Sequence, residues 1–199
     1  SIMEATMKAC ITGILAVLLA CLAPAGAYAI VEIAGYGGYP WGRHMVYYPS
    51  RDTDRADGLQ FGGHAHLTAA VFPVQLGAGL FHNSSVLDTR KDGSDTDVIR
   101  RTTGFSVALQ ISIPETDLAV YGKGGFSFYD HYILKPDAGG RRTKGRLFST
   151  STAGAGLAVA LFEPLWLFTE YQYFNSKYDK NDREFFRTHS VNMGLKLSI

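Results

Sequence analysis

The stretch Ser190-Val-Asn-Met-Gly-Leu-Lys-Leu-Ser-Ile199 indicates the fold of the whole chain. Apolar residues occupy its odd positions from 191 to 199, and small or polar residues occupy the even positions between them. Because successive side chains of a β-strand point to opposite faces, this stretch predicts a strand with one apolar and one polar face. The apolar face must cover either a protein core or lipid, and the rest of the chain distinguishes the two.

Seven further segments alternate in the same way. They are residues 30–38, 59–67, 74–81, 105–113, 118–129, 154–161 and 165–173. The links between segments alternate in length: residues 68–72, 114–117 and 163–164 are short, whereas residues 40–57, 82–100, 130–144 and 175–183 are long, polar and charged. Long loops at one end and tight turns at the other are typical of outer-membrane barrels. We therefore predict an all-β fold, an eight-stranded antiparallel up-and-down transmembrane β-barrel with both termini on the periplasmic side.

The first residues resemble a secretory leader. Met7-Lys8 precedes an apolar run over residues 11–22, and Ala27-Tyr28-Ala29 has the small-x-small form of a cleavage site. We expect residues 1–29 to be a signal peptide with an upstream extension that is removed, and residues 30–199 to form the barrel. An alternative is that Leu18-Leu19-Ala20-Cys21 acts as a lipobox whose cysteine is acylated. Both cysteines, Cys10 and Cys21, lie in this leader, so the barrel is expected to have neither a disulfide nor a cysteine metal ligand.

The polar face of the strands distinguishes lipid from a protein core. The rival interpretation is a soluble lipocalin-like barrel with its apolar face turned inward. The predicted polar face consists of many small residues and a few larger ones, namely Glu32, Gln60, His64, His66, Gln75, Gln110, Lys123, Glu170, Gln172, Asn192 and Lys196. A soluble surface would carry more charge, whereas the narrow lumen of an eight-stranded barrel needs such a mixture. Aromatic residues near both ends of the segments favour two membrane interfaces. The formal net charge of +1 argues against nucleic-acid binding.

Three short motifs resemble those of a known family. Tyr121-Gly-Lys-Gly-Gly-Phe126 and Glu170-Tyr-Gln-Tyr-Phe174 are similar to strands of the small eight-stranded outer-membrane barrels, such as the OmpA membrane domain and OmpX. Asn192-x-Gly194-x-x-Leu197-x-Ile199 resembles their C-terminal sorting signal, although bacterial examples usually end in an aromatic residue. The resemblance implies a location in a Gram-negative outer membrane and recognition of the last strand by the barrel assembly machinery. It also implies a structural and surface-interaction role, with extracellular loops that mediate adhesion or contacts with the host or envelope.

Six ionisable residues on the polar face are expected to form a network in the lumen: Glu32, His64, His66, Lys123, Glu170 and Lys196. The order of strands brings Glu170 and Glu32 toward Lys196, and Glu32 toward the two histidines. The first interpretation is an internal ion-pair network, because a narrow interior cannot leave charges unpaired. A second is a gated conduit or proton-linked switch. A third is a metal site formed by Glu32, His64 and His66, but its spacing is not specific, and we predict neither metal nor cofactor.

The loops supply the candidate binding residues. Lys135, Arg141, Arg142, Lys144 and Arg146 surround Gly139-Gly140 in the third loop, and such cations can bind lipopolysaccharide phosphates or acidic glycans. Outer-membrane lipid, lipopolysaccharide, and host surface or serum proteins are the expected partners. Two alternatives stay open. One is a narrow channel or transporter of small solutes. The other is a lipid A-modifying enzyme of the deacylase type, in which His82-Asn-Ser-Ser85 or His189-Ser190 would need an acid partner that the sequence does not indicate, so we predict no enzymatic activity.

Overall fold

The computed structural model describes residues 28–46, 53–91, 94–136, 143–146, 149–177 and 184–199. Residues 1–27, which hold most of the expected signal peptide, lie outside the described residues. The strands are β1 (Tyr28–Val46), β2 (Thr53–Val71), β3 (Val74–Lys91), β4 (Ser94–Ser112), β5 (Leu118–Pro136), β6 (Thr143–Arg146), β7 (Ser149–Phe162), β8 (Leu165–Lys177) and β9 (Glu184–Ser198). None of the residues that the structure describes forms a helix long and apolar enough to cross a membrane.

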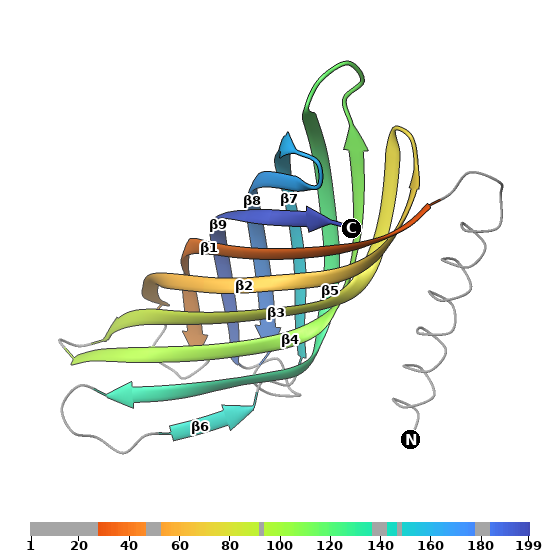
Figure 1. Ribbon diagram of the computed structural model, residues 1–199. Coiled ribbons are helices and arrows are strands. Elements are labelled where there is room, and N and C mark those ends of the chain that lie inside the picture. The colour runs from red at the N-terminus through yellow and green to blue at the C-terminus, as the bar shows by residue number, and fades with distance from the viewer. Residues whose placement is uncertain (1–27, 47–52, 92–93, 137–142, 147–148, 178–183) are drawn as a thin grey trace, which may run out of the picture.

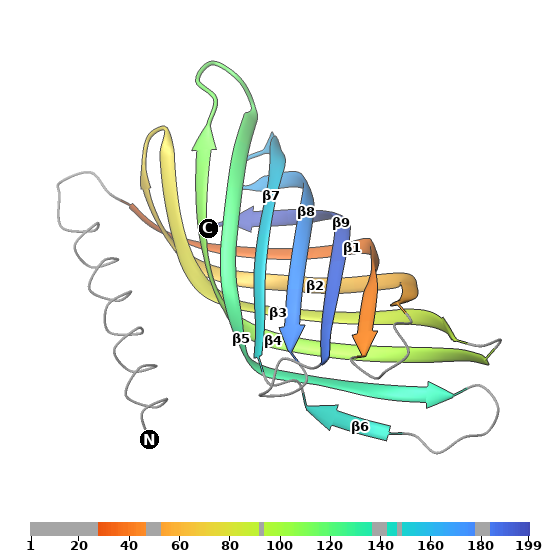
Figure 2. The ribbon, with the colours of Figure 1, turned by 180° about the vertical axis from the view of Figure 1, so that it is seen from behind.

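Eight of these strands close into an antiparallel barrel. The sheet runs in the order β4-β3-β2-β1-β9-β8-β7-β5-β6, and β4 also pairs with β5, which closes the ring. Figure 1 shows β1 to β4 on the near wall, and Figure 2 shows β5, β7, β8 and β9 on the opposite wall. The short strand β6 pairs with the outer part of β5. The predicted eight-stranded antiparallel barrel is thus confirmed.

One end of the barrel carries the tight turns. Phe72–Pro73, residues 113–117 and residues 163–164 link strands there, and the first strand meets the last at the same end. The backbone N–H of Val31 donates to the carbonyl oxygen of Ile199 at 2.7 Å. Short turns mark the periplasmic end of such barrels, so the opposite end is the outer end.

The first three links at the outer end are largely strand in their described residues, which corrects the sequence prediction. Residues 40–57 and 82–100 were expected to be loops, but β1 continues to Val46, β3 continues to Lys91 and β4 begins at Ser94. The ladder between β3 and β4 extends to the pair Lys91↔Ser94. Both faces of a strand are polar where it leaves the membrane, so the alternation of hydrophobic and polar residues that marks a strand disappears there.

The two faces of the strands differ as the alternation predicts. Leu109 and Met193 face outward and keep 45% and 63% of their surface exposed, which is typical of a lipid-facing surface. Tyr36 and Phe168 point inward and form a small core with three buried alanines. Glycines provide the space for these rings, since a Cβ at Gly194 would lie 2.8 Å from atoms of both Phe168 and Tyr36. Large apolar residues therefore face outward, and the lumen is filled by polar and aromatic side chains.

Candidate functional site

The lumen near the turn end holds a group of charged residues that we call the inner cluster: Glu32, His64, His66, Tyr121, Lys123, Glu170 and Lys196. Glu32 of β1 is central, because its carboxylate lies 3.1 Å from Lys196 Nζ and 3.1 Å from His64 Nε2. Glu32 and His66 are direct cross-strand partners, and the two histidine rings stack with their centroids 4.5 Å apart. His66 Nε2 lies 2.8 Å from Ser106 Oγ of β4. Four strands thus contribute to one connected group.

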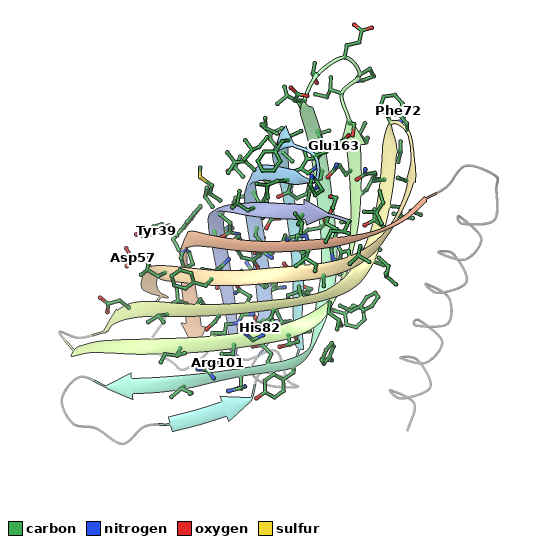
Figure 3. The ribbon with its side chains drawn as sticks, viewed as in Figure 1. Tyr39, Asp57, Phe72, His82, Arg101 and Glu163 are labelled. Atoms are coloured by element: carbon green, nitrogen blue, oxygen red, sulfur yellow. The ribbon has the colours of Figure 1, made fainter. Side chains whose placement is uncertain are left out.

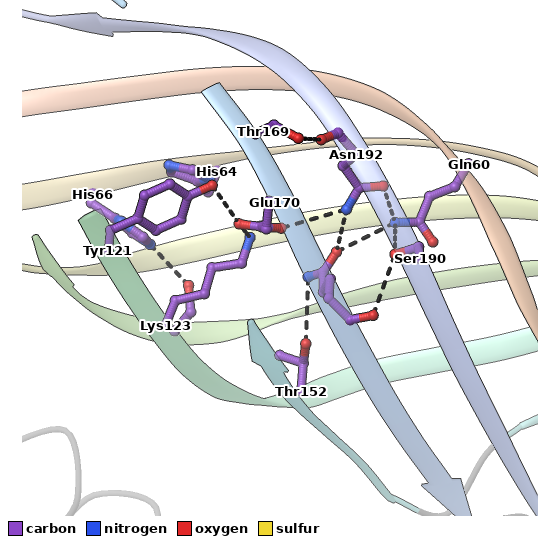
Figure 4. Close-up of polar contacts among 12 residues, drawn as sticks. Gln60, His64, His66, Tyr121, Lys123, Thr152, Thr169, Glu170, Ser190 and Asn192 are labelled. Atoms are coloured by element: carbon purple, nitrogen blue, oxygen red, sulfur yellow. Dashed lines mark hydrogen bonds and ion pairs between the residues drawn. The ribbon is translucent and has the colours of Figure 1, made fainter. Parts of the chain in front are cut away.

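The second carboxylate of the inner cluster has its own cation. Glu170 is 1% exposed, and its carboxylate lies 2.8 Å from Lys123 Nζ. The Tyr121 hydroxyl donates to the same carboxylate at 3.0 Å, and the Asn192 side-chain amide donates to it at 3.5 Å (Figure 4). Each buried carboxylate of this cluster is therefore neutralised and also hydrogen-bonded, as a poorly hydrated interior requires.

The structure pairs the charges differently from one sequence expectation. Lys196 contacts Glu32, whereas Glu170 contacts Lys123 and not Lys196. The register explains this difference, because Glu170 lies opposite Asn192 while Lys196 lies opposite Trp166. Four residues along a strand correspond to about 13 Å, which is beyond the reach of an ion pair. All six residues that the sequence singled out are nevertheless buried and lie in the lumen.

An amide cluster lies next to the inner cluster on the outer side. It consists of Gln60, Gln172, Ser190 and Asn192, each 1% exposed or less. The Gln60 side-chain amide donates to Ser190 Oγ at 3.1 Å and to Asn192 Oδ1 at 3.0 Å, and the Asn192 amide donates to Gln172 Oε1 at 3.2 Å (Figure 4). Because β2, β8 and β9 all contribute, these amides connect opposite walls of the barrel and fill the lumen.

A further charged group, the outer cluster, lies toward the outer end and consists of Arg100, Thr102, Asp130, Thr150 and Ser176. Arg100 Nη2 lies 3.2 Å from the Asp130 carboxylate, and both side chains are 2% exposed. The Thr102 hydroxyl donates to Asp130 at 3.1 Å, and the Thr150 hydroxyl also donates to it. Thr150 is in turn 2.8 Å from Ser176 Oγ. This cluster connects β4, β5, β7 and β8.

Sequence reasoning missed the outer cluster, although one signal was available. Arg100 has an even residue number, like the inward-facing Ser106 and Gln110 of β4. Continued alternation along the strand would therefore have placed Arg100 in the lumen. In β5 the inward-facing residues are odd-numbered at Lys123 but even-numbered at Asp130. The change occurs because the register of β4 and β5 shifts: Gly104 pairs with Ser127, whereas Thr103 pairs with Tyr129. Phe128 is the extra residue of this β-bulge. The bulge reverses the facing of β5 and turns Asp130 inward.

Every lumen cation of these clusters also lies over an aromatic ring. Lys123 Nζ is 5.3 Å from the centroid of Tyr36, and Lys196 Nζ is 5.3 Å from the centroid of Trp166. Arg100 Cζ is 5.1 Å from the centroid of Phe174. A cation within about 6 Å of a ring face is attracted to it, more strongly when both are desolvated. Each cation thus contacts both a carboxylate and the face of an aromatic ring. The order of the strands alone does not predict these ring contacts.

The inner cluster encloses only a small space. A cavity of about 20 Å³ is lined by residues that include Glu32, His66, Gln110, Lys123 and Lys196. This space suffices for about one water molecule. The amide and outer clusters fill the lumen beyond it. The described lumen is therefore packed and its carboxylates are paired, although the buried atoms His64 Nδ1, His66 Nδ1 and Gln60 Oε1 have no hydrogen-bond partner among the described residues.

The three candidate metal ligands lie close together, but the charge of Glu32 is already neutralised by Lys196. One ligand atom from each of Glu32, His64 and His66 lies within 4.8 Å of the others. The Lys196 ammonium already neutralises Glu32 at 3.1 Å. A divalent cation would add charge beside that ammonium in a poorly hydrated interior, which is unfavourable. These residues therefore fit an ion-pair network better than a metal centre.

The predicted loop cations lie partly on strands. Lys135 belongs to β5, and Lys144 and Arg146 belong to β6, where they pair with Ile133 and His131. Arg141 and Arg142 lie outside the described residues. The sequence places all five residues in one loop, but three of them lie on the paired strands β5 and β6.

The hydrogen-bond partners of His82 and His189, the histidines of the two His/Ser motifs, are not the carboxylates that a hydrolase would need. His82 Nδ1 lies 2.8 Å from Thr103 Oγ1, and His189 Nδ1 lies 2.5 Å from the Tyr171 hydroxyl oxygen. His189 faces outward, whereas Ser190 is buried in the lumen. In the described part of the chain, no hydrogen bond or ion pair joins either histidine to a carboxylate.

Comparison with known proteins places the chain among membrane barrels. Residues 13–198 match the model of the outer membrane protein beta-barrel domain. Neisserial surface protein A (NspA) is 11% identical with a TM-score of 0.52, and the match covers 86% of this chain and 98% of that chain. Ail of Yersinia pestis is 17% identical with a TM-score of 0.46, covering 83% and 98%. The N-terminal barrel domain of Pseudomonas aeruginosa OprF is 14% identical with a TM-score of 0.44, covering 87% and 99%. None of the curated proteins matches the chain in sequence.

Proposed function

The chain belongs to the outer membrane protein beta-barrel family, and we propose that it acts as a closed anchor whose outer strand ends bind a partner outside the cell. Its location is the bacterial outer membrane. The proposed role is adhesion to a surface or contact with another component of the envelope, and it requires a stable barrel and an accessible binding platform.

The length of the strands carries this proposal. Strands β1 to β5 have 18 or 19 residues each, whereas β7, β8 and β9 have 13 to 15. A membrane-crossing strand needs only about 9–11 residues. Because the tight turns hold one end, we expect the additional residues of β1 to β5 to extend beyond the outer membrane surface. Figure 1 shows β3, β4 and β5 projecting at the end opposite those turns. Such a rigid projecting sheet supports recognition of a partner by its strands and the links between them.

The packed lumen supports an anchor rather than a pore. Charged residues of the inner and outer clusters are paired, and the amide cluster connects β2 with β8 and β9. Eight strands enclose an interior that side chains fill. The side chains of these clusters would have to rearrange together before a solute could pass.

Shortening the projecting sheet tests the proposal. In the variant, residues 86–99 are replaced by Asn-Gly, a two-residue turn suited to joining the paired Ser85 and Arg100. Both barrels are produced in a bacterium that adheres poorly, and the bacteria bound to cultured epithelial cells are counted. We expect the full barrel to increase adherence and the shortened barrel to lose that increase. Equal adherence of the two strains would contradict the role proposed for the projecting sheet.

Two measurements make the result interpretable. A mobility shift of unheated against boiled samples shows whether the shortened barrel is folded in the outer membrane. Conductance of the purified full barrel in a planar lipid bilayer tests whether the anchor is closed, and we expect no steady current above that of the bare bilayer. A steady single-channel conductance would favour the narrow-channel alternative instead.

A further inference from the structure

The outward face of β3, β4 and β5 carries two polar rows at the outer edge of its apolar band. In the first row, His82 pairs with Thr103, which pairs with Tyr129. In the second row, Ser84 pairs with Arg101, which pairs with His131, and the register continues to Arg146 of β6. The row on the membrane side is apolar and consists of Leu80, Phe105 and Phe126. Hydrogen-bond donors therefore lie directly above an apolar surface.

The side chains of these rows are accessible and ordered by contacts. His82 and Arg101 are both exposed, and they lie on the same side of the barrel in Figure 3. His82 Nδ1 lies 2.8 Å from Thr103 Oγ1, and the rings of Tyr129 and His131 meet edge-on at 4.8 Å. When the Thr103 hydroxyl donates to Nδ1, the other ring nitrogen of His82 carries a hydrogen that can be donated to a ligand.

The outer part of the neighbouring strands β1, β2 and β9 has a different chemistry. There the Tyr39 hydroxyl donates to Asp57 at 2.5 Å, and Trp41 stacks on His189 with centroids 6.1 Å apart. On β3, β4 and β5, Asp130 points into the lumen toward Arg100, and Asp88 lies four residues beyond Ser84 along β3. The two polar rows thus contain a guanidinium, imidazoles and hydroxyls but no carboxylate, and they favour an anion.

We propose that His82, Ser84, Arg101 and Thr103 bind a phosphate group of an outer-leaflet glycolipid. The Arg101 guanidinium supplies forked N–H donors to the phosphate oxygens, and the hydroxyls and the His82 ring supply further donors. The acyl chains of the same lipid lie along Leu80, Phe105 and Phe126, whose two phenyl rings are 6.4 Å apart. A free phosphate would use only the polar half of this surface. This site is independent of the partner bound by the projecting sheet.

Binding of lipid A to the refolded full chain in detergent micelles tests the site. Fluorescently labelled bisphosphorylated lipid A is titrated with the wild-type barrel, with Arg101→Gln and with Arg187→Gln. Arg187 is the matched control, because it is an exposed arginine in the outer part of β9. We expect Arg101→Gln to weaken binding by about tenfold, the effect of losing a charge-assisted hydrogen bond, and Arg187→Gln to change it less than about twofold.

Each other outcome argues against the site. Unchanged affinity of Arg101→Gln, or an equal loss in both variants, would show that the glycolipid is attracted only by diffuse charge. Equal affinity for lipid A from which both phosphates have been removed would show that the phosphate is not recognised. Competition by millimolar inorganic phosphate as strong as that by lipid A would show that the apolar row contributes nothing. The heat-induced mobility shift of each variant verifies that it is folded.

Discussion

The inner and outer clusters of the lumen stabilise buried charge in different ways. In the inner cluster, the Glu32 carboxylate, two ammonium groups and two imidazoles line one small cavity, and Glu170 joins them through Lys123. In the outer cluster, Asp130 has one cationic partner, Arg100, among the described residues, and two threonine hydroxyls complete its hydrogen bonds. The inner cluster therefore spreads its charge over several groups, while the outer cluster depends on a single pair. This difference predicts how strongly each cluster responds to the loss of one cation.

Loss of Arg100 should have the largest effect. Arg100→Met leaves Asp130 buried without its cation, and breaking such a pair typically costs about 3–5 kcal/mol. We expect this decrease in the free energy of unfolding, measured by guanidinium titration of the barrel refolded in lipid vesicles. The double variant Arg100→Met/Asp130→Leu removes both charges and should recover most of the loss. A double variant as unstable as the single one would show that packing of Arg100, and not its charge, stabilises the outer cluster.

Loss of Lys196 should cost less. After Lys196→Met, Glu32 still has His64 Nε2 at 3.1 Å, and Lys123 lines the same cavity. We expect the free energy of unfolding to fall by about 1–3 kcal/mol, the cost of an incompletely satisfied buried group. The same guanidinium titration measures it. A loss as large as that of Arg100→Met would mean that the imidazoles do not compensate and that the two clusters are equivalent.

The contrast between the clusters also explains what the sequence predicted. Alternation over the apolar band identified the strands and the facing of Glu32, His64, His66, Lys123, Glu170 and Lys196, because lipid outside and polar groups inside impose a period of two. The outer cluster lies where both faces are polar, so this signal is lost at Arg100.

Partner choice in the lumen was predictable only in part. Strand order specified which strands meet, but the register, which brings Glu170 opposite Asn192, determines which side chains meet. The bulge at Phe128 depends on local pairing of β4 and β5 and leaves no mark in the alternation that precedes it. Residues of the outward polar rows, such as His82 and Ser84, lie in a predicted loop, so the sequence does not show that they align across three strands.

A double-mutant cycle should give the smallest effect and the sharpest comparison of the clusters. Because Lys123 and Lys196 line the same cavity, each partly neutralises the carboxylate that the other loses. We expect Lys123→Met/Lys196→Met to lower the free energy of unfolding by at least about 0.5 kcal/mol more than the sum of the single variants, as residues that share a cavity interact. Arg100→Met combined with Lys196→Met joins two separate networks and should be additive within about 0.5 kcal/mol. Coupling of similar size in both cycles would mean that the lumen responds as one electrostatic unit and that the division into two clusters is wrong.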